Sequence, residues 1–256
     1  MGPDEARAWY VISLRPQGEH AALRRAAARV GAGLIELSPW ALVPRGDDIA
    51  IAALQAALDA DVVLFTSPAA VRFAAQLQPL NARDGQAWIA TGAGTRLALQ
   101  RAGITQAIAP TRMDSEGLLA LTALSSLQDR SVGLVTAPDG RGVLAPSLQA
   151  RGAQLRLAEI YDRKPCALPA AALAQLATCT APTCLALSSG GALQQVLQRL
   201  PDPLKQRLLG ATAIAASPRL EAVAREAGFA AIVPAQGPRP AQLMAAAHAW
   251  FSHRIR

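Results

Sequence analysis

Cysteine and histidine are scarce in this sequence, and their scarcity excludes several classes of protein. The 256 residues contain three scattered histidines, His20, His248 and His253, and three cysteines, which are Cys166, Cys179 and Cys184. An odd number of cysteines without ligand spacing argues against a disulfide scaffold and against a zinc site. We therefore expect free thiols in a reducing compartment and no bound metal.

Long apolar runs are also absent, because charges or prolines interrupt every stretch before the roughly 18 residues that span a membrane. The opening MGPDEARAW carries two acidic residues and no apolar core, so we do not interpret it as a secretory signal. With 52% hydrophobic and 17% charged residues, the chain is neither disordered nor a coiled coil. We expect a cytoplasmic globular protein with no membrane partner.

The charge of the chain is basic, with a formal net charge of +7. Of the 25 basic residues, only Lys164 and Lys205 are lysines. A basic protein attracts polyanions. Nucleic-acid binding normally uses clustered arginines and aromatic residues that stack on bases, whereas here aromatics are 4% and the arginines are spread evenly. We expect no nucleic-acid partner and favour a small ligand with several carboxylates or phosphates.

Short apolar runs alternate with segments of helical period along the whole chain. Runs of continuous apolar character predict buried parallel strands, and the amphipathic segments after them predict covering helices. The fold class is therefore α/β. The predicted strands cover residues 9–14, 61–67, 87–92, 132–137, 184–189 and 211–217.

Four glycines follow the last periodic residue of predicted helices, where a left-handed conformation favours glycine. They are Gly31, Gly103, Gly152 and Gly228. After three of these stops we expect a new strand almost at once, in the segments GLIEL (33–37), GITQAI (103–108) and GFAAIV (228–233).

An internal repeat emerges when the sequence is compared with itself. The spacing from Leu14 to Val135 is 121 positions, and the spacing from Ser67 to Ser188 is also 121. At each matched place an apolar strand leads through a hydroxyl, proline or glycine turn into a helix. The repeat predicts two similar α/β lobes.

Two proline-bounded extended segments, LSPWALVPRGDD and AEIYDRKPCALP, suggest where these lobes join. If they pair, they form a two-stranded β linker covering residues 39–45 and 159–166. Residues 46–158 would then form one lobe, and residues 1–38 with 167–256 would form the other, discontinuous lobe.

Ligands of open α/β sheets bind at the carboxyl ends of the strands. Those ends repeatedly carry a hydroxyl followed by proline or glycine at a helix start, as in Ser67-Pro68 and Ser217-Pro218. Such a turn presents free N–H groups and a side-chain hydroxyl, which suit carboxylates or phosphates. Each serine taken singly is also an ordinary helix cap. Repetition in both lobes favours a cleft that grips one large anion from two sides.

Other chemistries have weaker support. The segment from Thr91 to Leu97 has two of the three glycines of a dinucleotide fingerprint, but Leu97 occupies the third place. No nucleophile elbow, Cys/His pair or metal cluster is present. In the linker, alternation along a strand turns Tyr161 away from Glu159 and Asp162. A tyrosine there serves either packing with one hydrogen bond or proton donation.

Seven segments, in order along the chain, resemble the uroporphyrinogen-III synthase family. They are LRP (14–16), FTSPAAV (65–71), TGAGTRLAL (91–99), SEGLL (115–119), GRGVLAPSLQARGAQL (140–155), EIYDRKP (159–165) and SPRLEAVAREAGF (217–229). The resemblance implies two α/β lobes with a two-stranded linker. It also implies a cofactor-independent hydro-lyase of tetrapyrrole biosynthesis, which converts hydroxymethylbilane, a linear tetrapyrrole with eight carboxylates, into uroporphyrinogen III. The reaction loses the terminal hydroxyl, closes the macrocycle and inverts ring D.

The family pattern also implies roles for individual residues. Tyr161 matches the linker tyrosine that is favoured as the proton donor. The hydroxyl positions of the family's binding cleft match Ser67, Thr95, Ser188, Ser189 and Ser217, and we add Arg15 and Arg141 as cations for the carboxylates. The alternative function is a two-lobe intracellular binding protein for a polyanionic small molecule. We expect the protein to be a monomer.

Overall fold

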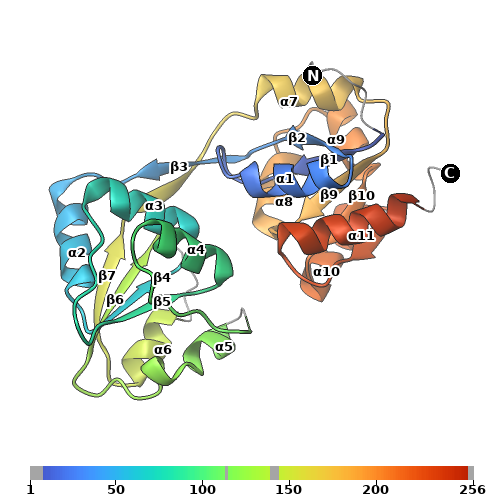
Figure 1. Cartoon of the computed structure of the whole chain (residues 1–256). Helices are drawn as coiled ribbons and strands as arrows, with labels where there is room; N and C mark the ends of the chain where they lie inside the picture. The colour runs from blue at the N-terminus through green and yellow to red at the C-terminus, as the bar shows by residue number, and fades with distance from the viewer. Residues whose placement is uncertain (1–7, 113–114, 139–143, 253–256) are drawn as a thin grey trace. The chain divides into compact units, whose positions relative to one another are not determined.

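The chain forms two compact units, each built on its own parallel sheet (Figure 1). The structure is a computed structural model that describes residues 8–112, 115–138 and 144–252. The first unit combines Met1–Ala41 with Lys164–Arg256, and the second consists of Leu42–Arg163. Each unit is therefore described by itself below.

The sheet of the first unit is five-stranded, with the order β11-β10-β9-β1-β2. All its pairings are parallel, and Tyr10 of β1 lies opposite both Gly33 and Thr183. Continuous apolar character buries β1, β9 and β10 on both faces. The strands are β1 (Tyr10–Ser13), β2 (Gly33–Glu36), β9 (Thr183–Leu187), β10 (Thr212–Ala215) and β11 (Ile232–Pro234).

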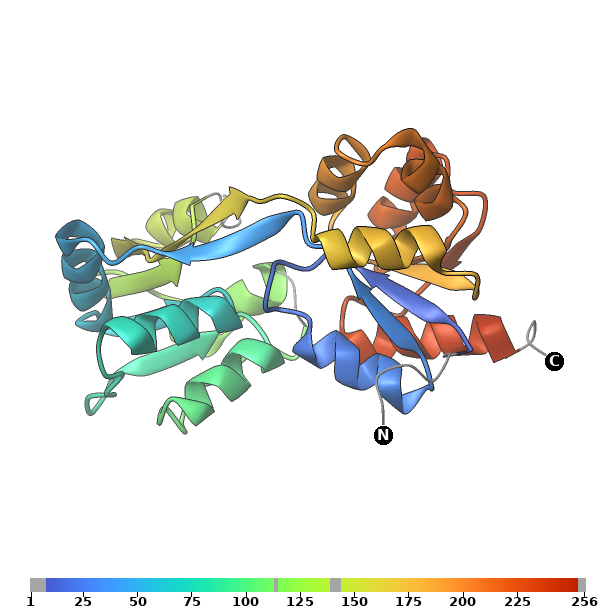
Figure 2. The same ribbon diagram turned by 90° about the horizontal axis from the view of Figure 1, so that it is seen from above.

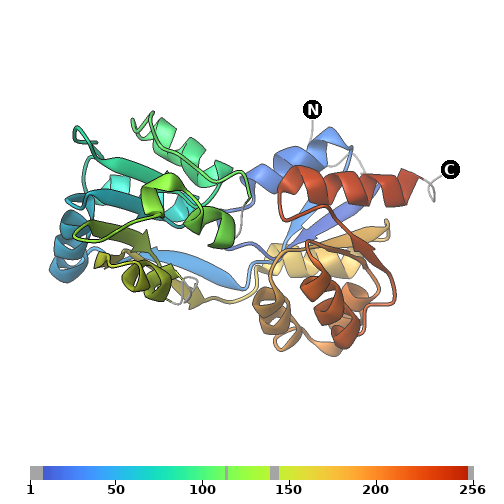
Figure 3. The same cartoon turned by 90° about the horizontal axis from the view of Figure 1, so that it is seen from below.

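Helices cover both faces of this sheet. On one face, α1 (Ala21–Arg29) lies beside α11 (Pro240–Ser252), as Figure 3 shows. The opposite face carries the remaining helices of the unit, seen above the sheet in Figure 2. They are α7 (Ala170–Thr178), α8 (Gly190–Leu197), α9 (Asp202–Leu209) and α10 (Pro218–Ala227).

The sheet of the second unit is four-stranded and parallel, with the order β5-β4-β6-β7. Its apolar side chains divide into two cores, one on each face, around Phe65 and Leu64 of β4. The strands are β4 (Val62–Phe65), β5 (Ala87–Ala90), β6 (Ser131–Thr136) and β7 (Gln154–Glu159). One face is covered by α2 (Asp48–Leu58), α3 (Pro68–Leu77) and α4 (Ala93–Arg101), and the other by α5 (Ser115–Leu119), the 3₁₀ helix at Thr122–Leu124 and α6 (Leu144–Ala150).

A third sheet consists of β3 (Trp40–Pro44) and β8 (Tyr161–Pro165). The N–H of Arg45 donates to the carbonyl of Ile160 at one end, and the N–H of Cys166 donates to the carbonyl of Pro39 at the other. Since residue numbers rise along one strand as they fall along the other, the pair is antiparallel. The predicted α/β fold with two parallel sheets and a two-stranded linker is thereby confirmed.

The predicted helix stops are confirmed, because Gly31, Gly103, Gly152 and Gly228 have φ values of 73°, 95°, 89° and 96°. The strand predicted at 103–108 is wrong. After α4 the chain turns, and only Ile108 pairs with the sheet, as a single parallel bridge to Ile89. The segment is apolar because Ile104 and Ala107 fill the core, which does not require a strand.

The predicted repeat is confirmed in the topology of the two sheets. Subtracting 121 from the number of Ser131, the first residue of β6, gives Tyr10, the first residue of β1. Adding 121 to the number of Val62, the first residue of β4, gives Thr183, the first residue of β9. The order β5-β4-β6-β7 then corresponds to β10-β9-β1-β2. The Ile108 bridge occupies the place that β11 has in the first unit.

Candidate functional site

The carboxyl edge of the second unit's sheet is lined with hydroxyl side chains. Ser67 follows β4 and is the N-cap of α3, where its Oγ accepts a hydrogen bond of 3.0 Å from the N–H of Ala70. Pro68 at the first helical position fixes φ for the helix and needs no N–H partner. The sequence Ser-Pro thus begins α3 at this edge, and its serine acts as a helix cap.

Tyr161 reaches Ser67 from the linker strand β8. Its phenol oxygen lies 3.0 Å from the Oγ of Ser67, and either hydroxyl can be the donor. The tyrosine is only 2% exposed, and its ring lies 5.3 Å from that of Phe73, whereas Ser67 is half-buried. The two hydroxyls therefore form a chain that leads from the core to the edge of the sheet.

The carboxylates beside Tyr161 serve a different purpose. Arg45 donates from Nε to Oδ1 of Asp162 over 2.9 Å and from Nη1 to Oε2 of Glu159 over 3.2 Å. The hydrogen bond with Asp162 is the largest cause that raises the pKa of Arg45. The tyrosine and the two acids have different partners, and Glu159 ends β7 whereas Tyr161 begins β8, so alternation along one strand does not relate these two residues. The ion pairs hold the start of β8 against the end of β3.

Three threonines at this edge are not among the predicted site residues. Thr66 Oγ1 donates to Thr136 Oγ1 over 2.8 Å, and Thr91 Oγ1 donates to the carbonyl of Thr66 over 2.8 Å. They tie together the ends of β5, β4 and β6. Their signal in the sequence is a hydroxyl at or directly after the end of an apolar strand. Thr95, which is predicted, lies in the first turn of α4 and is 4% exposed.

The equivalent edge of the first unit carries the other predicted serines. Ser189 is the N-cap of α8 and accepts from the N–H of Ala192 over 3.3 Å, while Ser188 before it is exposed. Ser217 stands at the N-cap position of α10 without a side-chain capping bond. Since β9 and β10 are neighbours in the sheet, these three serines follow adjacent strands. The hydroxyl of Ser217 is not used by its own helix.

Arg15 follows β1 at the same edge and is half-buried. Burial lowers the pKa of its guanidinium from the ordinary value, and the negative charge of Glu19 opposes that shift. An arginine side chain stays protonated in proteins, so Arg15 is a cation at the edge of the sheet. The other predicted cation, Arg141, lies outside the described residues.

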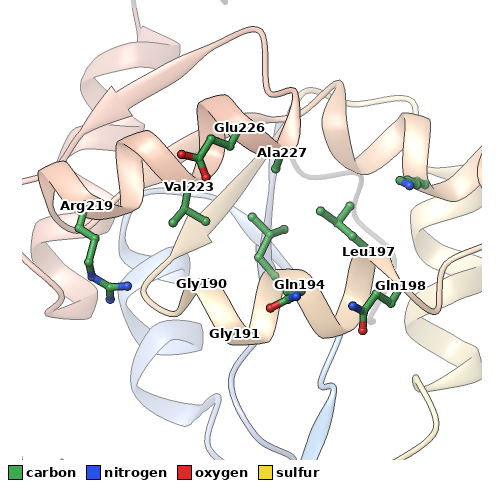
Figure 4. A pocket seen from close by; sticks show the side chains of 11 residues that line it. Gly190, Gly191, Gln194, Leu197, Gln198, Arg219, Val223, Glu226 and Ala227 are labelled. Atoms are coloured by element: carbon green, nitrogen blue, oxygen red, sulfur yellow. The ribbon is translucent and has the colours of Figure 1, made fainter.

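A hollow of about 620 Å³ lies between α8 and α10, close to these serines (Figure 4). Leu193, Leu197 and Val223 form its apolar part, and Arg219 stands at the end nearest the first turn of α10. Arg219 is an exposed cation that the sequence analysis did not single out. The sequence contains a signal for Arg219, because this residue directly follows Ser217-Pro218 at the start of the helix.

The described residues form neither a metal-binding cluster nor a membrane span. In ranges 8–112, 115–138 and 144–252, histidine, cysteine, aspartate and glutamate nowhere gather in a group of three that could hold a metal ion. None of the helices that the structure describes has both the length and the apolar character to cross a bilayer. All three cysteines are free thiols.

Comparison with known proteins gives the family. Residues 21–245 match the family model "Uroporphyrinogen-III synthase HemD". The uroporphyrinogen-III synthase of Salmonella typhimurium is 33% identical over 178 residues, which are 66% of this chain and 71% of that protein. The Escherichia coli enzyme of the same name is 29% identical over 201 residues, covering 77% of this chain and 80% of the relative.

Solved structures share the fold. The uroporphyrinogen-III synthetase of Helicobacter pylori has a TM-score of 0.62 at 16% identity, over 96% of this chain and 99% of that one. A mutant uroporphyrinogen III synthase of Thermus thermophilus gives 0.59 at 17% identity, with the same coverage of 96% and 99%. These likenesses extend over both units and the linker.

Proposed function

The chain belongs to the uroporphyrinogen-III synthase (HemD) family of cyclising hydro-lyases, and on that premise we propose how its residues perform the reaction. The substrate is hydroxymethylbilane, and no cofactor takes part. The observation that carries this proposal is the pair of hydroxyls, Ser67 and Tyr161, 3.0 Å apart at the carboxyl edge of a parallel sheet. That edge is where open α/β sheets bind their ligands.

Each unit offers groups that suit the carboxylates of the substrate. Helix starts at Ser67, Ser189 and Ser217 offer N–H groups and hydroxyls to anions. Arg15 and Arg141 add positive charge. A formal net charge of +7 draws an octacarboxylate towards the protein. Thr95 and Ser188, the remaining hydroxyls of the family pattern, complete the proposed set, although reaching Thr95 requires α4 to shift because that side chain is buried.

Proton delivery is the chemical step that we assign to the Ser67–Tyr161 pair. The terminal hydroxyl of the substrate takes a proton from the pair and leaves as water. The lone pair of the adjacent pyrrole nitrogen forms the new C=N bond of an azafulvene as the C–O bond breaks. Carbon C16 of ring D then attacks the methylene carbon of the azafulvene to give a spiro intermediate. The bond between C15 and C16 breaks, and C15 bonds to C19 instead, which inverts ring D. A proton released when the last pyrrole regains aromaticity restores the pair.

Within the pair, Tyr161 supplies the proton, and Ser67 is the more accessible of the two hydroxyls. Tyr161 is enclosed by protein, whereas Ser67 is half-buried at the edge. Ser67 gives its own proton to the leaving hydroxyl and receives another from Tyr161. This transfer needs no movement of the tyrosine ring. The rest of the protein's contribution is orientation, which can lower a barrier by several kcal/mol without a strong acid or base.

Isomer analysis tests the function. Purified protein is added to freshly prepared hydroxymethylbilane, and the product is oxidised to porphyrin and separated by chromatography. We expect the type III isomer, whereas an unchanged type I product would reject a synthase. A polyanion-binding protein would instead raise its melting temperature with the ligand and release that ligand intact.

Two further properties are part of the proposal. We assign a cytoplasmic location, supported by the free thiols of Cys166, Cys179 and Cys184, which suit a reducing compartment. We also assign a monomeric state, which light scattering during gel filtration tests against the chain mass of 26.6 kDa.

A further inference from the structure

A buried histidine in the first unit joins two strand ends through its side chain. His20 Nδ1 lies 2.9 Å from the Oγ of Ser13, and its Nε2 lies 2.7 Å from the Oγ of Ser38. The exposed fractions of His20, Ser13 and Ser38 are 2%, 0% and 1%. Sequence reasoning treated His20 as one of three scattered histidines, because its partners are 7 and 18 positions away.

Burial excludes a direct catalytic role for this Ser–His–Ser group. A nucleophile or proton donor must touch the substrate, and neither serine hydroxyl is accessible. What the group does is structural and local. Ser13 is the last residue of β1, and His20 directly precedes α1, so their hydrogen bond closes the base of the loop 14–19.

The closed loop is the one that carries Arg15. Its turn is completed by the N–H of Glu19, which donates to the carbonyl of Pro16 over 3.0 Å. The N–H of Gln17 donates to the carbonyl of Trp40 over 2.9 Å, two residues after Ser38. His20 and Gln17 therefore both fasten the loop to the segment 38–40, where the linker strand β3 begins.

The charges around the ring favour its neutral form. Burial is the largest cause that lowers the pKa of His20, and the positive charges of Arg24 and Arg15 lower it further. Glu36 and Glu19 act in the opposite direction. A neutral imidazole has one N–H and one acceptor nitrogen, so it accepts from one serine and donates to the other. Protonation removes the acceptor and places a second positive charge beside the guanidinium of Arg15.

We propose that His20 is a positioning residue for substrate binding, which fixes the loop 14–19 so that Arg15 meets a substrate carboxylate. The inference rests on the proposed function of Arg15. Ser13 and Ser38 belong to the same device, since each holds one nitrogen of the ring. The device predicts that changes at His20 affect the Michaelis constant for hydroxymethylbilane rather than the turnover number.

The test compares four full-length variants, H20L, H20Q, R15Q and the double variant R15Q/H20L, in steady-state assays that detect the type III isomer. We expect R15Q and H20L each to raise KM about tenfold, the effect of losing a hydrogen bond to a charged group. H20Q retains a donor and an acceptor and should raise KM at most about threefold, with kcat close to that of the unaltered protein.

The double variant separates positioning from general destabilisation. If His20 acts through Arg15, R15Q/H20L has the same KM as R15Q alone. A purely structural histidine would lower the melting temperature of H20L and leave its remaining folded fraction with the original KM. Multiplying effects of the two changes, or an unchanged KM in H20L, would overturn the inference.

A measurement on the unaltered protein keeps the inference testable if H20L does not fold. Because the pKa of His20 is lowered, KM should rise as the pH falls from the ordinary histidine value of 6.5 to the point where the protein begins to unfold. The ratio of this KM to that of H20Q at each pH removes the titration of the substrate itself. A ratio that stays constant over this range overturns the proposal. Absence of type III product from the unaltered protein would instead reject the proposed function, so the two failures are distinguishable.

Discussion

The hydrogen bond between Ser67 and Tyr161 predicts a coupling that a double-mutant cycle measures. Tyr161→Phe removes one hydroxyl and keeps the ring against Phe73, so it opens no cavity. It costs about 1 kcal/mol of the free energy of unfolding, the usual net value of one hydrogen bond. Ser67→Ala removes the same bond and also the cap of α3, which is worth about 1 kcal/mol, so it costs about 2 kcal/mol in total.

The double variant loses the shared bond once, and its expected cost is about 2 kcal/mol rather than about 3 kcal/mol. The coupling energy is therefore about 1 kcal/mol. For activity, a positioned general acid contributes roughly 10²-fold to 10⁴-fold. We expect the lower figure, about 100-fold in kcat, because the pyrrole nitrogen of the substrate drives much of the departure of water.

The assay combines urea unfolding followed by circular dichroism with initial rates of type III formation. If the two hydroxyls act as one unit, S67A and Y161F each lose about 100-fold and the double variant loses no more. Ser67→Thr is the matched control, since threonine keeps both the hydroxyl and the cap. Losses that multiply to about 10⁴-fold, or a Y161F variant with full activity, would refute the relay.

The remaining predictions concern stability. Gly133→Ala should destabilise the second unit by about 3 kcal/mol or more, because a Cβ on β6 would lie 1.9 Å from the backbone oxygen of Ala57 in α2. Gly94→Ala is the control, since its Cβ would meet nothing nearer than Pro68 Cγ at 3.7 Å. In the same urea experiment its free energy of unfolding should stay within about 1 kcal/mol of that of the unaltered protein. Hydrogen bonds from the Oγ and the N–H of Ser131 lower the pKa of Asp61. These bonds therefore stabilise the fold at pH values above the ordinary aspartate pKa near 4. Their contribution is lost as the pH falls through the lowered pKa. Ser131→Ala removes one of these bonds, and its melting temperature should fall less steeply than that of the unaltered protein below pH 4; parallel curves would show that Asp61 is not responsible.

The sequence predicts the two sheets well because their strands are buried on both faces. A run such as VVLF at residues 62–65 has no polar alternative, and the glycine stops limit the helices between such runs. The wrong strand prediction at residues 103–108 has a physical reason. Apolar residues signal burial, and Ile104 is buried without belonging to a strand. Periodicity over so few residues cannot distinguish the two cases.

The candidate site is less predictable, because it depends on contacts between residues distant in the chain. Ser67 and Tyr161 are 94 positions apart, and no local pattern pairs them. Thr95 follows a glycine-rich turn, as a ligand-binding hydroxyl would, but the packing of α4 encloses it. His20 has no distinguishing neighbours in the sequence, and its role depends on Ser13 at the end of β1 and on Ser38, two residues after the end of the adjacent strand β2. Local chemistry predicts which residue types stand at an edge, whereas tertiary packing decides which of them are accessible.

The duplicated topology explains why a reaction that needs one proton can use two nearly equivalent sheet edges. Both units begin a helix with a capping serine after the corresponding strand, Ser67 after β4 and Ser189 after β9. An edge of this kind binds anions, and a substrate with eight carboxylates needs more than one. Proton delivery is required at a single carbon–oxygen bond, and in the described residues the tyrosine partner belongs to the cap of the second unit. The first unit instead has Arg15 and the uncapped hydroxyl of Ser217, which are binding groups in the proposed function. We infer that the linker strand, by placing Tyr161 against the edge of the second unit, makes that edge the catalytic one.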